Sequence, residues 1–266
     1  MIRTGIGGWT YADWRKGGFY PEGLPQKREL EWASRQLGAI EINGTYHSLQ
    51  KPDSFRKWRE ATPEGFVFAV KGSSYITNRK VLAAAGEALP RFFAQGLEEL
   101  GDRLGPILWQ LMGTKKFDAE DIAAFLALLP RELQGRPLRH AIEVGHESFA
   151  CAEFVDICRT AGVAIVWCEQ ASRTPIADRT ADFAYLRCKN LVASEPAGYA
   201  PDGLARIAGL CRAWEAGAAP EDLPYAGHPA DSRGREGEVF AFMINGAKER
   251  APAAAMALAG LVKGSQ

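Results

Sequence analysis

Short apolar runs recur along the chain, and several of them lead into a polar or charged residue. In the run Ala39–Asn43, Glu41 and Asn43 share one face, because side chains alternate along a strand. Burying a carboxylate and an amide there is costly unless each meets a partner or a ligand. The pattern predicts the chemistry of the protein at Glu41 and Asn43 and at the strand ends that repeat it, which carry Lys71, Gln110, Glu143, Arg187 and Asn245.

Eight of the apolar runs have the length of buried strands. We predict strands at Ile2–Gly7, Ala39–Asn43, Phe66–Lys71, Ile107–Leu111, His140–Val144, Ala164–Cys168, Phe183–Cys188 and Val239–Ile244. Apolar residues at helical spacing, with Asp or Pro near several starts, predict helices between most of them. These are Lys27–Leu37, Ser54–Ala61, Leu97–Leu104, Asp118–Leu129, Cys151–Ala161, Pro201–Glu215 and Ala253–Val262.

Alternating strands and helices over this length predict a single TIM-type (β/α)8 barrel, an α/β fold that occupies residues 1–266 as one domain. The strands are nearly all apolar, as expected when both faces of a sheet are covered. Two connections differ from the rest. The sixth unit, Glu169–Pro175, is too short for a full helix. The connection from Lys189 to Glu238 is long, and we expect its Gly/Pro-rich part, Gly217–Gly237, to fold over the barrel mouth.

Composition narrows the class of protein. A hydrophobic fraction of 47% supports a large core, and 32 basic side chains balance 32 acidic ones. Zero net charge argues against a protein held mainly by a nucleic-acid backbone, although a local basic patch stays open. The first residues lack the apolar region of a signal peptide, and no run has transmembrane length. We therefore expect no membrane partner. Five cysteines without a Cys-x-x-Cys pair favour reduced thiols, so we expect a cytoplasmic protein.

Several ordered motifs resemble the DUF72 (YecE-like) family almost from end to end. They are Thr4–Trp14, Gly18–Pro21, Glu41–Tyr46, Trp58 with Thr62-Pro63, Phe66–Lys71, Gly105–Leu111, Glu143 and Thr180–Arg187. The resemblance implies a TIM-type barrel, in agreement with the strand count. It implies little about activity, because the family is one of unknown function.

The chain departs from that family pattern at strand ends. Where the family usually has Asn-Ser-Thr, this chain has Asn43-Gly44-Thr45. Where the family often has Arg-x-His-Gly, it has Arg187-Cys188-Lys189-Asn190. In the stretch Glu-x-Arg-His-x-Ser-Trp, Gly145 replaces the arginine and Phe149 the tryptophan. Paired asparagines in the last strand are reduced to Asn245. A different substrate, or a loss of activity, would originate at such positions.

Active sites of such barrels lie at the carboxyl ends of the strands, so the polar residues named above are predicted to converge on one pocket. Glu41, Lys71 and Glu143 are the candidate catalytic residues. Desolvation at a strand end lowers a lysine pKa and suits Lys71 to act as a general base or a Schiff-base nucleophile. The alternative is structural: Glu41 with Arg187, and Glu143 with Lys71, would be buried ion pairs.

The other candidates are ligand-binding residues. Arg187 offers a planar fork to a carboxylate or phosphate, and amide side chains would orient the ligand. An aromatic cluster after the first strand could stack on a sugar or a base, or form the small core of its own loop. Tyr46 and His47 are expected at the rim. The full ligand-binding set is Trp9, Tyr11, Asn43, Tyr46, Gln110, Arg187 and Asn245.

No cofactor or metal is expected. Glu41, His47, Glu143 and His146 could be assembled into a metal site, but they lack a recognisable ligand spacing. The glycine-rich stretch Gly5–Gly8 lacks the third glycine and the lysine of phosphate loops and is interpreted as a turn that positions Trp9.

These features predict an enzyme that acts on a small polar, anionic or sugar-like substrate at the barrel mouth. Hydrolase, lyase and isomerase chemistry all stay open. Two alternatives have different partners. One is a metal-dependent nuclease or DNA-repair-like barrel, by fold analogy alone. The other is a ligand-binding protein that has lost its chemistry.

Overall fold

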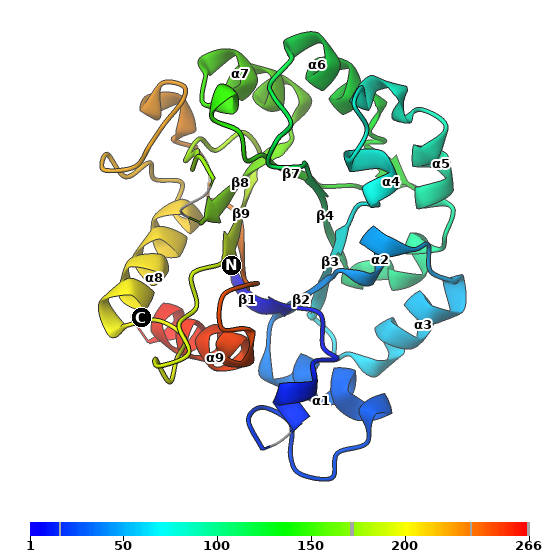
Figure 1. Ribbon diagram of the computed structural model, residues 1–266, viewed down its shortest axis with the longest axis vertical. Coiled ribbons are helices and arrows are strands. Elements are labelled where there is room, and N and C mark those ends of the chain that lie inside the picture. The colour runs from blue at the N-terminus through cyan, green and yellow to red at the C-terminus, as the bar shows by residue number, and fades with distance from the viewer. Residues whose placement is uncertain (16, 171–172, 235, 265–266) are drawn as a thin grey trace.

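The computed structural model describes residues 1–15, 17–170, 173–234 and 236–264. Eight parallel strands close into a barrel in the order β1-β10-β9-β8-β7-β4-β3-β2, with helices around it (Figure 1). The barrel strands are β1 (Ile2–Gly7), β2 (Ala39–Ile42), β3 (Val67–Lys71), β4 (Leu104–Gln110), β7 (His140–Glu143), β8 (Ala164–Glu169), β9 (Phe183–Cys188) and β10 (Glu238–Met243). The predicted TIM-type barrel is confirmed.

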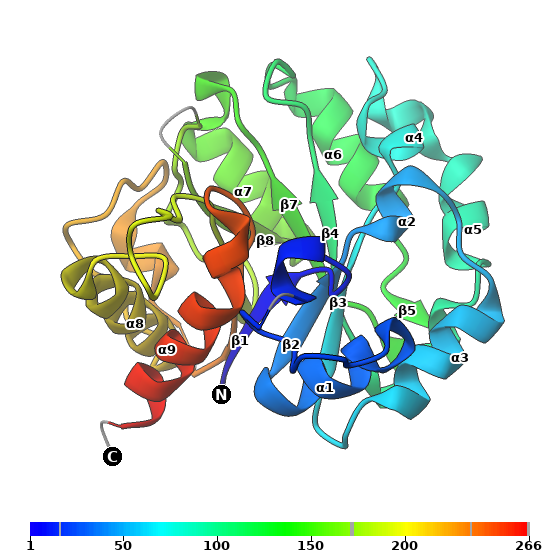
Figure 2. The same cartoon turned by 60° about the horizontal axis from the view of Figure 1, so that its bottom comes forward.

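The α-helices cover the outside of the barrel, as the side view also shows (Figure 2). They are α1 (Glu29–Gln36), α2 (Gly44–His47), α3 (Pro52–Ala61), α4 (Ser74–Thr77), α5 (Ala88–Phe93), α6 (Ala119–Leu128), α7 (Ala152–Ala161), α8 (Pro201–Glu215) and α9 (Ala251–Lys263). Short 3-10 helices lie at Ala12–Arg15, Gln26–Arg28, Leu82–Ala85, Leu97–Arg103, Glu147–Phe149, Pro229–Ser232 and Lys248–Arg250.

Local sequence explains where several helices begin and end. Proline occupies the first turn of α3 and α8, where a missing N–H is tolerated. The Asp118 carboxylate caps α6 by accepting a hydrogen bond from the amide of Asp121. Gly162 ends α7 in the left-handed conformation, with φ of 67°. These signals allowed most long helices to be predicted within a few residues of their observed bounds.

Some elements differ from the prediction. Leu97–Leu104 is not a regular helix: it is a 3-10 helix interrupted at Gly101, where φ is 57° and ψ is −128°, and Leu104 already belongs to β4. The small antiparallel hairpin of β5 (Glu132–Leu133) and β6 (Arg136–Pro137) was not predicted. Its two turn residues, Gln134 and Gly135, both have positive φ, as a type I′ turn requires.

The sixth unit is irregular as predicted, because the described residues between β8 and β9 contain no helix; Ala171 and Ser172 lie outside the described part. The expectation for Gly217–Gly237 is wrong. The described residues of this segment, 217–234 and 236–237, lie on the outer flank of the barrel between α7 and α8 (Figure 1). Its backbone amides at Ala226 and Gly227 donate to the buried Asp178 carboxylate, at 2.7 and 3.1 Å. It covers a flank that a helix between β8 and β9 would otherwise protect.

Side chains fill the barrel interior in layers. At the amino ends of the strands, Glu238 pairs with both Arg3 and Arg139. A middle layer consists of apolar and aromatic side chains, including the stacked rings of Phe240 and Phe242. The layer at the carboxyl ends is charged. The interior is therefore a packed core, with a cavity at the carboxyl end of the strands, which we call the mouth.

Candidate functional site

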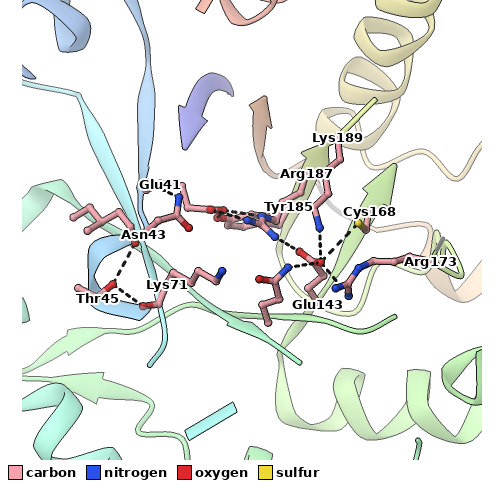
Figure 3. A network of polar contacts seen from close by, with 12 residues as sticks. Glu41, Asn43, Thr45, Lys71, Glu143, Cys168, Arg173, Tyr185, Arg187 and Lys189 are labelled. Carbon is pink, nitrogen blue, oxygen red and sulfur yellow. Dashed lines mark hydrogen bonds and ion pairs between the residues drawn. The ribbon is translucent and has the colours of Figure 1, made fainter. Parts of the chain in front are cut away.

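The polar residues predicted at the strand ends come together at the mouth, and Figure 3 shows Glu41, Asn43, Lys71, Glu143 and Arg187 among them. A cavity of about 450 Å³ lies there, which we call the mouth cavity. Its lining comprises Gly7, Asn43, His47, Lys71, Gln110, Gln170, Arg173, Arg187, Lys189, Ile244, Asn245 and Lys248. Glu41 and Glu143 are fully buried beside the lining residue Arg187. All seven strand-end candidates therefore belong to one site.

Arg187 joins the two buried carboxylates. Its Nε donates to Glu41 Oε2 at 3.0 Å and its Nη2 to Glu41 Oε1 at 2.9 Å, a bidentate pair. Its Nη1 donates to Glu143 Oε2. Tyr185 adds a hydroxyl donor to Glu41 at 2.8 Å. Burial alone would lower the pKa of Arg187, but Glu143 and Glu41 raise it, so the guanidinium stays charged.

Glu143 is surrounded by donors. Its Oε1 accepts from Lys189 Nζ at 2.6 Å and from Gln110 Nε2 at 2.8 Å, and Arg173 Nη1 lies 3.2 Å away. Burial opposes ionisation, but the charges of Arg187, Lys189 and Arg173 outweigh it and hold the pKa of Glu143 well below its usual range. The suggested pairing of Glu41 with Arg187 is present. Glu143 pairs with other cations instead of Lys71.

Lys71 differs from the other cations of the site. Its Nζ lies 4.0 Å from the centroid of the Tyr46 ring, and Lys71 takes part in none of the ion pairs formed by described residues. Burial and the nearby Arg187 charge lower its pKa to about 8, although Glu41 and Glu143 act in the opposite direction. A substantial fraction of this amine is therefore neutral near pH 8, in contrast to an ordinary lysine with a pKa of about 10.4.

We expect Lys71 to react with trace acetic anhydride with a midpoint near pH 8, because only the neutral amine is nucleophilic. Mass spectrometry of peptides after labelling across a pH series measures this midpoint. The exposed Lys57 in the same digest serves as the internal reference. A Lys71 midpoint near pH 10 would contradict the desolvated environment described above.

The aromatic cluster after β1 divides into two parts. Trp14, Phe19 and Tyr20 are buried and form the core of their own loop. Trp9 and Tyr11 are partly exposed and line a second cavity of about 290 Å³, which we call the aromatic cavity. Its lining comprises Gly7, Gly8, Trp9, Thr10, Tyr11, Trp14, Ile42, Asn43, Gly44, Gln50, Trp58 and Lys248. The cluster therefore forms the core of its own loop, while Trp9, Tyr11 and one side of Trp14 line the aromatic cavity; stacking on a sugar or a base stays a prediction.

Four residues of the site were not predicted. Lys189 follows Arg187 by two positions, so strand alternation could have found it. Tyr185 precedes Arg187 by two and could have been found in the same way. Arg173 and Lys248 lie in loops, where no periodic pattern marks them. The guanidinium of Arg173 takes the space beside Gly145, where an added Cβ would lie 2.7 Å from Arg173 Nη1.

The mouth carries excess positive charge. Among the described residues, five cationic side chains line the cavity, and the two carboxylates beside them leave an excess of three, or two when Lys71 is neutral. His47 lines the rim. In the part of the chain that the structure describes, no three His, Cys, Asp or Glu side chains gather as metal ligands, so Glu41, His47, Glu143 and His146 form no such group.

The fold and the mouth site define the class of this protein: a TIM-type barrel with a polar cavity at the carboxyl ends of its strands. The chain belongs to the DUF72 family, described as a protein of unknown function, which matches residues 3–266. It is 28% identical over 152 residues to the UPF0759 protein YecE of Escherichia coli K12, covering 56% of this chain. The match spans about half, 50%, of that relative's length.

Two solved structures of DUF72 family proteins have the same fold. One, from Thermotoga maritima, is 22% identical and superposes with a TM-score of 0.73 over 99% of both chains. Another, from Enterococcus faecalis, is 16% identical, with a TM-score of 0.68 over 99% of this chain and 96% of that one. Within the described residues, no helix is long and apolar enough to cross a membrane.

Proposed function

We propose that this protein is an enzyme that acts on a small, polar, anionic substrate in the mouth cavity, with Lys71 as the reacting group. The observation that carries the proposal is the contrast between Lys71 and its neighbours. Lys71 has a lowered pKa and forms no ion pair with any residue that the structure describes, whereas Arg187 and Lys189 are held by buried carboxylates. A partly desolvated amine in a cleft rich in charged groups is typical of catalytic lysines.

We assign Glu41 and Glu143 a positioning role in place of proton transfer. Both carboxylates are fully buried and accept several hydrogen bonds, and protonating Glu143 would leave Lys189 without its carboxylate partner and Arg187 with Glu41 alone. The carboxylates keep the cationic groups in place for an incoming anion. Asn43, Gln110 and Asn245 stay the proposed orienting groups, since each lines the cavity.

The neutral amine of Lys71 can act in two ways. It can accept a proton from a carbon acid, or it can add to a substrate carbonyl. In the addition, the nitrogen lone pair forms a C–N bond while the carbonyl π electrons move to oxygen. One amine proton passes to that oxygen to give a carbinolamine, and the second leaves with the hydroxyl group as water while the C–O bond breaks, which leaves an imine. Arg187 and Lys189 lie on the cavity wall and would stabilise negative charge that develops on the substrate.

Glycolaldehyde phosphate with cyanoborohydride should label Lys71 irreversibly, because reduction traps the imine. We expect labelling at least about tenfold faster than with unphosphorylated glycolaldehyde, since charge-assisted contacts to the phosphate concentrate the probe at the mouth. Peptide mass spectrometry identifies the modified lysine. Lys71→Met should abolish the adduct, and Lys57→Met, at an exposed position, should leave it unchanged. Equal labelling by both aldehydes, or none at Lys71, would refute the proposal.

A second candidate function is ligand binding without turnover. It is supported by the two buried carboxylates, which are fully occupied by cations and offer no free acid or base. The same experiment separates the candidates. Protection of Lys71 from acetylation by phosphate, without an imine adduct from the phosphorylated aldehyde, would favour the binding protein.

A further inference from the structure

The mouth cavity and the aromatic cavity are neighbours with common walls. Gly7, Asn43 and Lys248 line both of them. Gly7 lies at the end of β1. An added Cβ at Gly7 would lie 3.0 Å from the Asn43 amide nitrogen and 3.1 Å from Ile244 Cδ1, so these two side chains already pack closely against this position. The two cavities therefore adjoin, and a ligand held in one lies next to the other.

The aromatic cavity has the lining of a ring-binding subsite. Trp9 is anchored on one side, because its backbone carbonyl accepts a hydrogen bond from the hydroxyl of Tyr20. On the other side its ring meets Trp58 edge-on, with centroids 5.2 Å apart and an interplanar angle of 77°. Tyr11 is held against Trp14 in a similar edge contact at 5.2 Å. Rings positioned before the ligand arrives lose little conformational entropy on binding.

Most of the described lining of the aromatic cavity is aromatic, apolar or glycine. Its uncharged polar side-chain groups are those of Thr10, Asn43 and Gln50, the Tyr11 hydroxyl and the indole N–H groups of Trp9 and Trp58. A sugar ring carries several hydroxyl groups, and each hydroxyl left without a partner in a desolvated pocket weakens binding. A flat unsaturated ring needs few hydrogen bonds and gains from stacking. The lining therefore favours a planar ring over a sugar.

Charge defines the other end of the ligand. The mouth cavity has an excess of two or three positive charges, which matches a phosphate monoester, a dianion near neutral pH, better than a single carboxylate. Lys248 stands at the common wall, with its Nζ 5.1 Å from the Tyr11 ring centroid and 5.9 Å from that of Trp14. It can contact an anion in one cavity while its charge faces the rings of the other.

We propose that the ligand of this protein is a phosphate monoester of a planar-ring compound, with the phosphate in the mouth cavity and the ring in the aromatic cavity. The inference rests on the proposed function, because it takes the mouth cavity as an anion site. It adds that substrate choice is made by Trp9, Tyr11 and Trp58, outside the cationic site. Lys71 lines the mouth cavity and would lie beside the phosphate end of such a ligand.

Titration calorimetry at low ionic strength with phenyl phosphate, methyl phosphate and glucose 6-phosphate tests the proposal. We expect phenyl phosphate to bind roughly ten- to a hundredfold more tightly than methyl phosphate, because stacking of a base on aromatic side chains gives a gain of this size. Trp9→Leu should reduce the affinity for phenyl phosphate to that for methyl phosphate. The affinity for methyl phosphate should not change. Trp32→Leu, at a partly buried tryptophan outside both cavities, is the matched control and should preserve both affinities.

The outcomes distinguish the two proposals. Equal affinities for phenyl and methyl phosphate, or tighter binding of glucose 6-phosphate, would overturn the ring subsite while the anion site stands. Equal weakening of both phosphates by Trp9→Leu would also overturn it. If Trp9→Leu lowers the thermal midpoint by itself, Trp58→Phe gives the same comparison with a smaller ring. Failure of all three phosphates to bind would refute the anion site and the inference together.

Discussion

Replacing Arg187 with methionine is expected to lower the free energy of unfolding by about 3–5 kcal/mol, because it leaves two buried carboxylates without their shared partner. Glu41 would keep the hydroxyl of Tyr185 as its remaining side-chain donor. Glu143 would keep Lys189 and Arg173. Urea unfolding at neutral pH measures the change. The matched control is Arg28→Met, in an exposed pair with Glu31, where we expect a loss of at most about 1 kcal/mol.

The loss should depend on pH. The pKa of Glu143 is depressed in the folded protein, so its pairing stabilises the native state above the unfolded-state pKa of about 4.3 and loses this contribution as the pH falls through the folded value. The wild-type protein therefore has this contribution at neutral pH, and Arg187→Met has lost the part that Arg187 supplies, while Lys189 and Arg173 supply the rest. The difference in stability between the two proteins should shrink on acidification. A constant difference from pH 7 to pH 3 would contradict the assigned pairing.

Gly5→Ala is expected to destabilise the barrel by about 3 kcal/mol or more, at or beyond the upper end of ordinary overpacking. An added Cβ would lie 2.1 Å from the carbonyl oxygen of Ala39 on the neighbouring strand and 3.1 Å from the Phe242 ring. Gly5 and Ala39 are register partners in the β1–β2 ladder, so the carbonyl cannot turn away without breaking strand pairing. Thermal or urea unfolding provides the measurement.

Gly209→Ala is the matched control for this substitution. Gly209 lies within α8, and an added Cβ there meets no atom within 4 Å. Because alanine is the better helix former, we expect a gain of about 0.5–1 kcal/mol. If Gly5→Ala were as stable as Gly209→Ala, the close approach of β1 and β2 would be wrong.

The strands could be predicted because their signal is local. Each is a short apolar run between polar segments, and the run over Phe183–Cys188 was predicted with its observed bounds. The missed elements lack such a signal. Helix α2, Gly44–His47, is a single turn after β2 with no apolar periodicity. Gly101 breaks the Leu97–Arg103 segment through a backbone conformation that residue spacing does not reveal.

The position of the site could be predicted from the sequence, but most of the contacts between its side chains could not. Strand alternation predicted that Glu41 and Arg187 face the interior, and closure of the barrel brings them together. The partners of Glu143 depend on which strands are neighbours and on loop paths. Lys189 reaches Glu143 from the end of β9, two strands away in the barrel order, and Arg173 reaches it from a loop. Nothing in the order of residues along the chain marks such contacts.

The outer cover of β8 comes from chain that is synthesised after β9. Residues 217–234 lie on the flank between α7 and α8, where their amides meet Asp178 and where Gly227 approaches Val155 of α7. On the ribosome, β8 and β9 would thus emerge before the residues that cover this flank. The flank can be completed only after residues 217–234 have been synthesised. A chain cut between β9 and α8 would place residues 217–234 on a different fragment from the strands that they cover, β8 and β9.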